Sequence, residues 1–185
     1  MELEFALLSR RTVHEFIPEP SPPGLLERLV EAAHQAPCHK LTWPWRFRSL
    51  GPAARAGLVP LAVALKAGKT GRPPVGPLAD KVAAVWTAPM EVIAVTQVLA
   101  EDPLRREEDY AAVACAIQNM QLLAHALGLG AKWSTSPLIR HPDALALLDV
   151  NPEVERCVGF LLVGRPLRVG AVERPPAAGL LRRLP

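Results

Sequence analysis

The sequence predicts an α+β sandwich with one sheet, in a single domain that spans residues 1–185. A chain of 185 residues fits one domain, since single domains usually contain roughly 100 to 200 residues. Half of the residues are hydrophobic, which is enough for a packed core. Helix and strand patterns alternate irregularly, without strict βαβ units, an internal repeat or a linker.

Two helices are predicted near the N-terminus. Apolar residues cluster over residues 2–10, which favours a short buried helix that ends at the basic pair Arg10 and Arg11. Four prolines in residues 17–24 exclude a regular helix there. Apolar residues then return at helical spacing, which predicts a second helix over 24–35.

A strand and a helix follow the loop of residues 36–44. Bulky and charged residues alternate over 45–50, which is typical of a strand with one buried face. Residues 53–66 are rich in Ala and Leu and predict a helix that Pro60 should kink or divide. The Gly- and Pro-rich residues 67–77 are expected to form a mobile surface loop, a possible lid.

The middle of the chain predicts an interior strand and the central helix. β-Branched residues dominate 91–98, which indicates a buried strand that the acidic, proline-interrupted residues 101–109 end. Apolar residues then recur every three or four positions from Tyr110 to Leu127. The alanines of this helix allow close packing of another helix, including one from a second subunit.

The last third predicts two strands around a short helix. Residues 129–135 and the apolar run 158–163 are the expected strands, and residues 142–148 are the expected helix. The Pro- and Arg-rich tail from Val169 onward is expected to be extended.

Composition excludes several classes of protein. The net charge of +3 comes from basic residues scattered among 18 acidic ones, so nucleic-acid binding is not expected. Three widely spaced cysteines indicate neither a zinc site nor a disulfide framework, and no metal site is predicted. The chain has no secretory signal and no apolar run near the roughly 20 residues that cross a bilayer, so a soluble, cytoplasmic protein is expected.

Common catalytic motifs are missing from the sequence. It contains no His-x-x-x-His metal spacing, no G-x-S-x-G nucleophile elbow and no Walker phosphate loop. Gly128 and Gly130 follow a helix instead of opening one, so they are interpreted as a helix C-cap, not as a dinucleotide fingerprint.

Three short segments carry polar groups suited to ligand binding. Arg10–Arg11–Thr12 offers two guanidinium groups and a hydroxyl for a phosphate, or alternatively a dibasic helix end. Residues 36–45, with Cys38 and His39, form either a functional loop or a proline turn that buries aromatic residues. Lys132–Trp133–Ser134–Thr135 combines a cation, an aromatic plane and two hydroxyls.

The order of these segments resembles the nitroreductase family, in particular its short members. The resemblance covers nearly the whole chain, with gaps only in loops. The motifs that carry it are Arg10–Thr12, Ala36–Pro37 through Pro44–Trp45, the Ala-rich helix after Tyr110, Gly128–Ser134 and Val158–Pro166.

The resemblance implies a homodimer with a central, mainly antiparallel sheet flanked by helices and FMN at the subunit interface. It places the FMN phosphate and ribityl chain on Arg10, Arg11 and Thr12. The same site receives Gln35 and His39 from the partner subunit, and Trp133, Ser134 and Thr135 from the first. It also places residues 123–128 near the nicotinamide nucleotide.

Three positions depart from the family pattern. Trp43 stands where members commonly have Gln, Gln35 where close relatives can have Arg, and Cys38 where Ser or Asp is common. A catalytic role for Cys38 is not expected, because no base evidently pairs with it. The phosphate end of the site is thus better supported than the ring end.

The resemblance implies an oxidoreductase in which NADPH or NADH reduces FMN, and a nitroaromatic, quinone or related small-molecule acceptor then takes two electrons by a ping-pong mechanism. No catalytic side chain is assigned, since the flavin supplies the redox chemistry. Two alternatives remain open: a flavin binder with little turnover, and a different flavin-dependent reaction of the dehydrogenase or dehalogenase type.

Overall fold

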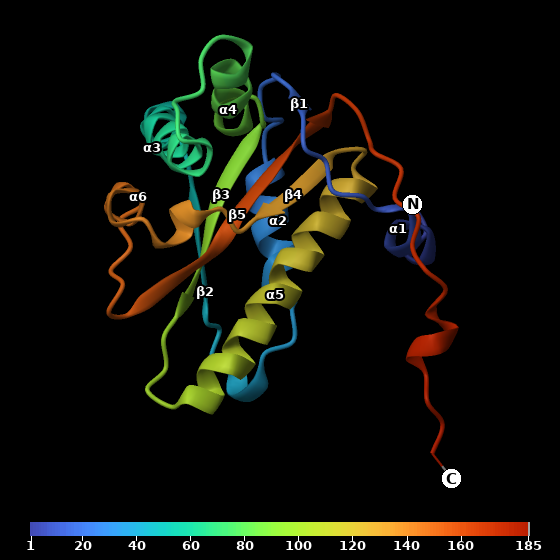
Figure 1. The fold of residues 1–185 in the computed structure, drawn as a ribbon. Coiled ribbons are helices and arrows are strands. Elements are labelled where there is room, and N and C mark those ends of the chain that lie inside the picture. Colours follow the sequence, from blue (N-terminus) through green and yellow to red (C-terminus); the bar gives the residue numbers. More distant parts are fainter. Residues whose placement is uncertain (185) are drawn as a thin grey trace.

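The computed structural model, which describes residues 1–184, contains a five-stranded sheet flanked by helices (Figure 1). The paired strands run in the order β1-β5-β3-β2, with β4 also on β5, and all of these pairs are antiparallel. The strands are β1 (Phe16–Ile17), β2 (Trp45–Ser49), β3 (Glu91–Val98), β4 (Gly130–Ser134) and β5 (Glu155–Pro166). The predicted α+β class and its mainly antiparallel sheet are confirmed.

Strand β5 organises the sheet. One of its edges pairs with β3, and its other edge pairs first with β4 and then, at Arg165 and Pro166, with β1. Residues 157–164 are all buried, because β5 has neighbours on both edges and helices on both faces. The strand is longer than the predicted 158–163, since pairing with β1 and β3 extends it beyond its apolar run.

Helices cover both faces of the sheet. They are α1 (Leu3–Ser9), α2 (Leu25–His34), α3 (Pro52–Thr70), α4 (Pro77–Thr87), α5 (Pro103–Ala126) and α6 (Pro142–Leu147), with 3-10 turns η1 (His39–Leu41), η2 (Pro137–Arg140) and η3 (Ala177–Leu180). Ile93 and Val95 of β3 pack toward α2 and α5, whereas Val92 and Ala94 pack toward α3, α4 and α6. Figure 1 shows α5 on one side of the sheet and α3, α4 and α6 on the other.

Helix α5 begins earlier than the sequence predicted. Residues 101–109 were expected to lie outside the helix, but α5 starts at Pro103, and the side chain of Asp102 accepts a 3.1 Å hydrogen bond from the Leu104 amide. Proline is tolerated in the first turn because its missing N–H has no helical partner there. The proline therefore begins the helix instead of interrupting it.

Pro60 does not divide the predicted helix. Helix α3 stays one helix through Pro60 and continues to Thr70, where Gly71, with φ +74°, ends it. Pro60 is exposed, while Leu58 is fully buried, so core packing offsets the lost backbone hydrogen bond. The expected loop of residues 67–77 shrinks to 71–76, because α4 starts at Pro77.

The C-terminal tail leaves the sheet after β5. Figure 1 shows it running past α1 and away from the body of the molecule. It is exposed from Leu167 to Leu184, with one 3-10 turn, η3. Among residues 1–184, no helix is both long and apolar enough to cross a membrane.

Candidate functional site

The N-terminal arginine motif lies against the outer edge of β4. Thr12 forms a parallel bridge with Ala131, and the amide of Val13 donates a 3.1 Å hydrogen bond to the Ala131 carbonyl. This pairing brings residues 10–12 next to the strand that carries Trp133. Two segments more than a hundred residues apart therefore meet at one sheet edge.

The two arginines differ in their contacts. Nη1 of Arg11 donates to the carbonyls of Leu8, at 2.7 Å, and of Arg10, at 3.0 Å, which is the helix-end role that was one interpretation of the motif. Nη1 of Arg10 donates only a long, 3.4 Å hydrogen bond to Oε1 of Gln121. No carboxylate within residues 1–184 forms a salt bridge with either guanidinium.

Burial lowers the pKa of Arg10, and the nearby positive charges of Arg174 and Arg11 lower it further. The guanidinium is still charged at any physiological pH, because the pKa of arginine ordinarily lies far above that range. A half-buried cation with cationic neighbours is stabilised by an anion. The local chemistry therefore fits a phosphate group.

A small cavity of about 200 Å³ opens beside these arginines. Arg10, Arg11, Val13, His125 and residues 128–131 line it. A Cβ on Gly130 would lie 2.8 Å from Cβ of Val13, so only glycine allows the N-terminal segment to come this close to β4. The close approach of the N-terminal segment to β4 therefore forms one wall of this cavity.

The three predicted residues around β4 point in different directions. Nε1 of Trp133 donates a 3.4 Å hydrogen bond to the Val158 carbonyl, and the ring packs on the α5 side of the sheet. Ser134 lines a cavity on the α3 and α4 side, as period-two alternation requires. Thr135 follows the strand and is exposed at a larger cavity.

The backbone of Trp133 offers a contact that the side chain does not. The Ala131 carbonyl points away from β5, toward Val13, so the amide and carbonyl of Trp133, two residues along, point to the same outer edge. A flat polar ligand at this edge can form hydrogen bonds with them.

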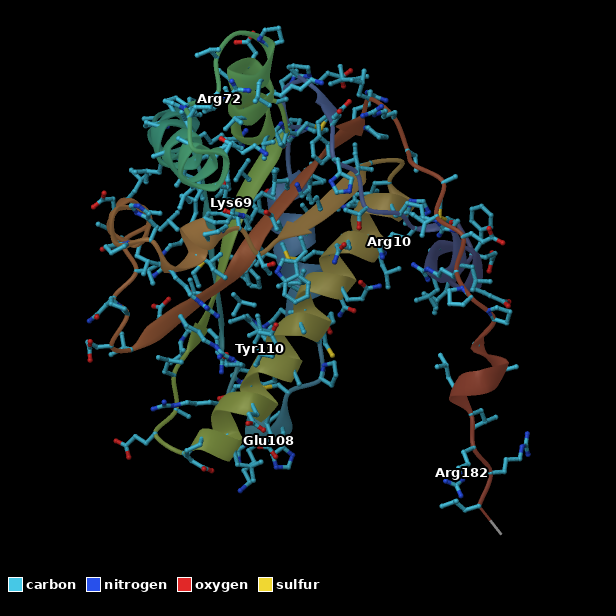
Figure 2. The ribbon with its side chains drawn as sticks, in the orientation of Figure 1. Arg10, Lys69, Arg72, Glu108, Tyr110 and Arg182 are labelled. Carbon is cyan, nitrogen blue, oxygen red and sulfur yellow. The ribbon has the colours of Figure 1, made fainter. Side chains whose placement is uncertain are left out.

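His39 lies far from the arginine motif of the same chain, whereas Gln35 lies closer, since Ala32, three residues before it, accepts a 3.1 Å hydrogen bond from Asn119 of α5. Nε2 of Gln35 bonds to Oε1 of Glu31 at 2.7 Å, and the His39 carbonyl accepts a 3.5 Å hydrogen bond from Arg105. Along α5, the 16 residues from Arg105 to Gln121 span about 24 Å at ~1.5 Å per residue. Figure 2 shows Arg10 near the C-terminal end of α5 and Glu108 near the other end.

The loop that carries His39 is held by a contact that the sequence did not reveal. Oγ1 of Thr42 donates a 2.6 Å hydrogen bond to Oδ1 of Asp109, which is only 4% exposed. The Trp43 amide donates to Sγ of Cys38 at 3.2 Å. Cys38 is therefore part of the internal structure of the loop: its thiol donates a 3.9 Å hydrogen bond to the backbone carbonyl of His39, and no histidine ring bonds to it among residues 1–184.

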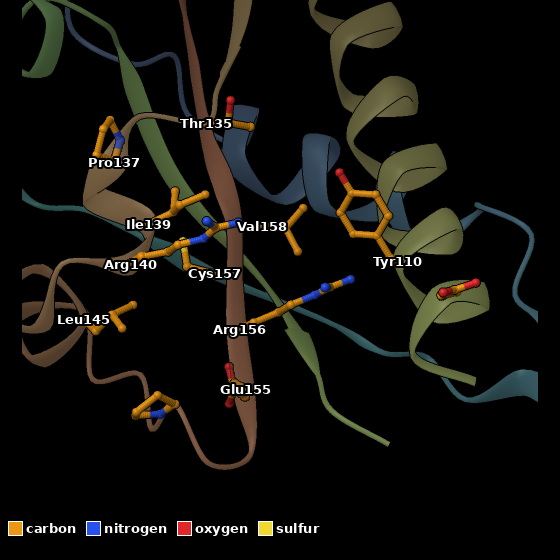
Figure 3. A pocket seen from close by; sticks show the side chains of 12 residues that line it. Tyr110, Thr135, Pro137, Ile139, Arg140, Leu145, Glu155, Arg156, Cys157 and Val158 are labelled. Atoms are coloured by element: carbon orange, nitrogen blue, oxygen red, sulfur yellow. The ribbon is translucent and has the colours of Figure 1, made fainter. Parts of the chain in front are cut away.

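A large cavity, of about 960 Å³, lies between the first half of α5, η2 and the start of β5 (Figure 3). The guanidinium of Arg156 lies 4.8 Å from the centroid of the Tyr110 ring. Thr135 forms part of the wall and so joins this cavity to the end of β4. Sequence reasoning missed the cavity, because its walls come from three separated segments.

Taken together, an antiparallel sheet between helices and a cationic cluster on its free edge define an α+β protein with a site for an anionic ligand. No three His, Cys, Asp or Glu side chains within residues 1–184 are grouped so that they could hold a metal ion. The model of the family described as "Nitroreductase family" matches residues 7–165. The chain belongs to the nitroreductase family, as its sequence motifs indicated.

Similar proteins cover the chain almost completely. The protein named putative NAD(P)H nitroreductase YfhC, from Bacillus subtilis strain 168, is 31% identical over 161 residues, which are 85% of this chain and 81% of YfhC. The crystal structure of a nitroreductase-like family protein from Bacillus cereus has a TM-score of 0.83 at 25% identity and covers 100% of this chain and 96% of its own.

A more distant structure shows the same fold. A variant of the FMN- and NADPH-dependent nitroreductase NfnB, from Sphingopyxis sp. strain HMH, has a TM-score of 0.79 at 16% identity. The alignment covers 99% of each chain.

Proposed function

We propose that the protein is an FMN-dependent oxidoreductase that uses NADPH or NADH to reduce nitroaromatic, quinone or related small-molecule acceptors in a ping-pong reaction. The observation that carries the proposal is the pairing of Thr12 with Ala131, which joins Arg10 and Arg11 to the edge of β4. The names of YfhC and NfnB, an NAD(P)H nitroreductase and an FMN- and NADPH-dependent nitroreductase, support it.

Arg10, Arg11 and Thr12 are proposed to hold the phosphate and ribityl end of FMN. The guanidinium of Arg10 is half-buried, lacks a carboxylate partner within residues 1–184 and lies beside a second arginine. A dianionic phosphate supplies the missing negative charge, and charge-assisted hydrogen bonds are the strongest available there. The residues present therefore fit the group.

Trp133, Ser134 and Thr135 are proposed to contact the flavin beyond its phosphate. The outward backbone groups of Trp133 are suited to hydrogen bonds with a polar ring edge, and the Trp133 side chain stiffens the strand by packing over Gly159. When bound, FMN supplies the redox chemistry: hydride is taken from the nicotinamide nucleotide and two electrons pass to the acceptor. The proposed role of the protein is to bind FMN and to orient the nicotinamide nucleotide and the acceptor beside it.

A homodimer is proposed because one chain separates the two halves of the site. The His39 carbonyl contacts Arg105, which lies about 24 Å along α5 from Gln121, the contact of Arg10, by the ~1.5 Å rise per residue. Gln35 is nearer, but its side chain bonds to Glu31 of its own helix. A second copy of this domain, residues 1–185, can place its own Gln35 and His39 over the arginine motif of the first. Helix α1 supports this, since five of its neighbouring apolar side chains are exposed: Met1, Leu3, Phe5, Leu7 and Leu8.

A cytoplasmic location is part of the proposal. Cys38, Cys115 and Cys157 are all free thiols in the described structure. Free thiols persist in reducing compartments.

The purified protein tests the proposal directly. It should be yellow, release FMN by mass spectrometry, elute as a dimer and bleach without oxygen on addition of NADPH or NADH. Adding a nitroaromatic or a quinone should then restore the oxidised spectrum. A colourless protein that FMN does not reconstitute would contradict the proposal.

A flavin binder with little turnover is the second candidate, favoured by Trp43 and Gln35. Trp43 is 41% exposed and its ring lies 5.2 Å from that of His34, so it presents an apolar surface where the family pattern has a polar side chain. Gln35 bonds to its own helix. Full flavin loading with negligible steady-state turnover of menadione and nitrofurazone would establish this candidate.

A further inference from the structure

The large cavity beside Thr135 has a composition that indicates a particular class of ligand. We propose that this cavity binds the electron acceptor and selects flat aromatic acceptors that carry a carboxylate or sulfonate group. The proposal rests on the proposed function, since it names the substrate class of that reaction. The cavity volume, about 960 Å³, admits an aromatic molecule of this kind.

One wall of the cavity is aromatic and rigid. Tyr110 is 39% exposed, so part of its ring is free to stack. Arg156 supports the ring: its guanidinium lies 4.8 Å from the ring centroid, and its Nε donates a 2.7 Å hydrogen bond to Oε1 of Gln97. Figure 3 shows Arg156 reaching from β5 toward Tyr110 on α5. A planar acceptor can stack on this wall.

The opposite wall carries an unpaired cation. Arg140 of η2 lines the cavity, and Figure 3 shows its side chain extending toward β5. Its guanidinium forms no hydrogen bond or salt bridge with any side chain or carbonyl of residues 1–184. Its five N–H donors are therefore available to a carboxylate or sulfonate.

The carboxylates of the lining do not cancel this charge. Glu155 is already engaged, since its oxygens accept hydrogen bonds of 2.9 and 3.2 Å from Arg48 and a third from Thr96. Glu107, on α5, is the other carboxylate in the wall. With Glu155 neutralised by Arg48, the two arginines Arg140 and Arg156 face one acidic group, so the cavity favours an anion.

The connection to the flavin site comes through Thr135. This residue belongs both to the cavity wall and to the segment proposed to contact FMN. A molecule stacked on Tyr110 therefore lies beside the proposed flavin position, where electron transfer needs it. The competing occupant is the flavin ring itself, and the experiment separates the two.

The test compares two acceptors of the same shape, 4-nitrobenzoate and 4-nitrobenzyl alcohol, in the parent protein and in Arg140→Gln. We expect the parent to prefer the anion, and the ratio of the two kcat/KM values to fall roughly 10- to 100-fold in Arg140→Gln, which is the typical effect of one hydrogen bond to a charged group. Arg28→Gln, on the exposed surface of α2, is the matched control and should keep the parental ratio.

Two further measurements complete the experiment. Tyr110→Ala should weaken both acceptors, because it removes the stacking surface that both use. Calorimetric titration of 4-nitrobenzoate should show weaker binding to Arg140→Gln, with the FMN dissociation constant unchanged. An unchanged acceptor ratio, or a loss of FMN affinity in Arg140→Gln, would overturn the proposal; the second result would mean that the cavity holds the flavin.

Failure of the proposed function gives a different pattern. If the protein binds no FMN, there is no turnover to compare, and the same titration into the flavin-free protein still tests the cavity. Binding of 4-nitrobenzoate that Arg140→Gln weakens would then support an aromatic-anion site, and no binding would exclude it.

Discussion

The hydroxyl of Thr42 donates a 2.6 Å hydrogen bond to the buried carboxylate of Asp109, which ties the loop of residues 38–43 to the first half of α5. Three residues of this loop, Lys40, Leu41 and Trp43, have positive φ angles. Such conformations cost on the order of 1 to 3 kcal/mol each and persist only where other contacts impose them. The contact therefore fixes the loop that presents His39.

Asp109→Ala should weaken FMN binding although Asp109 is not expected to touch FMN. Loss of the carboxylate frees the strained loop, so the partner subunit no longer offers His39 in one position, and affinity should fall roughly tenfold, the effect of about 1.5 kcal/mol. Fluorescence titration of FMN measures this, and circular dichroism checks the fold. Asp109→Asn keeps an acceptor for Thr42 and should recover most of the affinity. Equal loss in both variants would count against the positioning role.

Arg10→Ala should reduce FMN affinity more directly. It removes the proposed charge-assisted contact to the phosphate, worth about 1.5 to 3 kcal/mol, or roughly 10- to 100-fold in the dissociation constant. Arg10→Lys keeps the positive charge but lacks the planar guanidinium, so its FMN affinity should lie between those of the parent and Arg10→Ala. Titration of riboflavin, which lacks the phosphate, is the control, since its affinity should not change. Parental FMN affinity in Arg10→Ala would show that the phosphate lies elsewhere.

Gly159→Ala should destabilise the fold around β4. An added Cβ would lie 2.6 Å from Cδ1 of Trp133 and 3.0 Å from the Ser134 carbonyl, so the tryptophan would have to move. Overpacking of this kind costs typically about 1 to 3 kcal/mol in the free energy of unfolding. Urea denaturation measures it. Gly68→Ala, in α3 with open space around the new methyl, should instead be neutral or slightly stabilising.

Stability should fall in acid partly through Glu155. Hydrogen bonds from Arg48 lower the pKa of this carboxyl below its ordinary 4.5, although burial opposes them. A carboxyl with a lowered pKa in the folded state stabilises the protein above its unfolded pKa and loses that contribution as pH falls through the folded value. Thermal unfolding from pH 7 to pH 3 should therefore show a smaller loss in Glu155→Gln than in the parent. Parallel curves would exclude this contribution.

Local patterns were sufficient for much of the fold. The helical spacing that predicted α2 and the β-branched run that predicted β3 each lie within one short segment. The arginine motif was recognisable for the same reason, since its three residues are consecutive. Contacts in the folded chain separate the two arginines: Arg11 bonds to the end of α1, while Arg10 faces Gln121, and phosphate binding stays a prediction.

The errors occurred where proline was judged without its surroundings. Pro103 was taken as a break, but it occupies the first turn of α5, where proline is compatible with a helix. Pro60 was expected to kink or divide α3, and the helix is not divided there, where Leu58 is buried in the core. For Pro103 the position within the helix decided the outcome, and for Pro60 the neighbouring core contacts did.

The α+β class, most of the elements and the cationic motif could be inferred from the chain alone, because hydrophobic periodicity and charge are properties of neighbouring residues. Strand β1 and helix α4 were missed. Three contacts could not be inferred from the chain alone, because each joins segments whose approach depends on how the sheet and α5 pack. They are the contacts of Thr12 with Ala131, of Thr42 with Asp109 and of Tyr110 with Arg156. Only the folded chain shows that His39 is remote from Arg10, and this packing distance, not sequence spacing, is the reason for proposing a second subunit at the site.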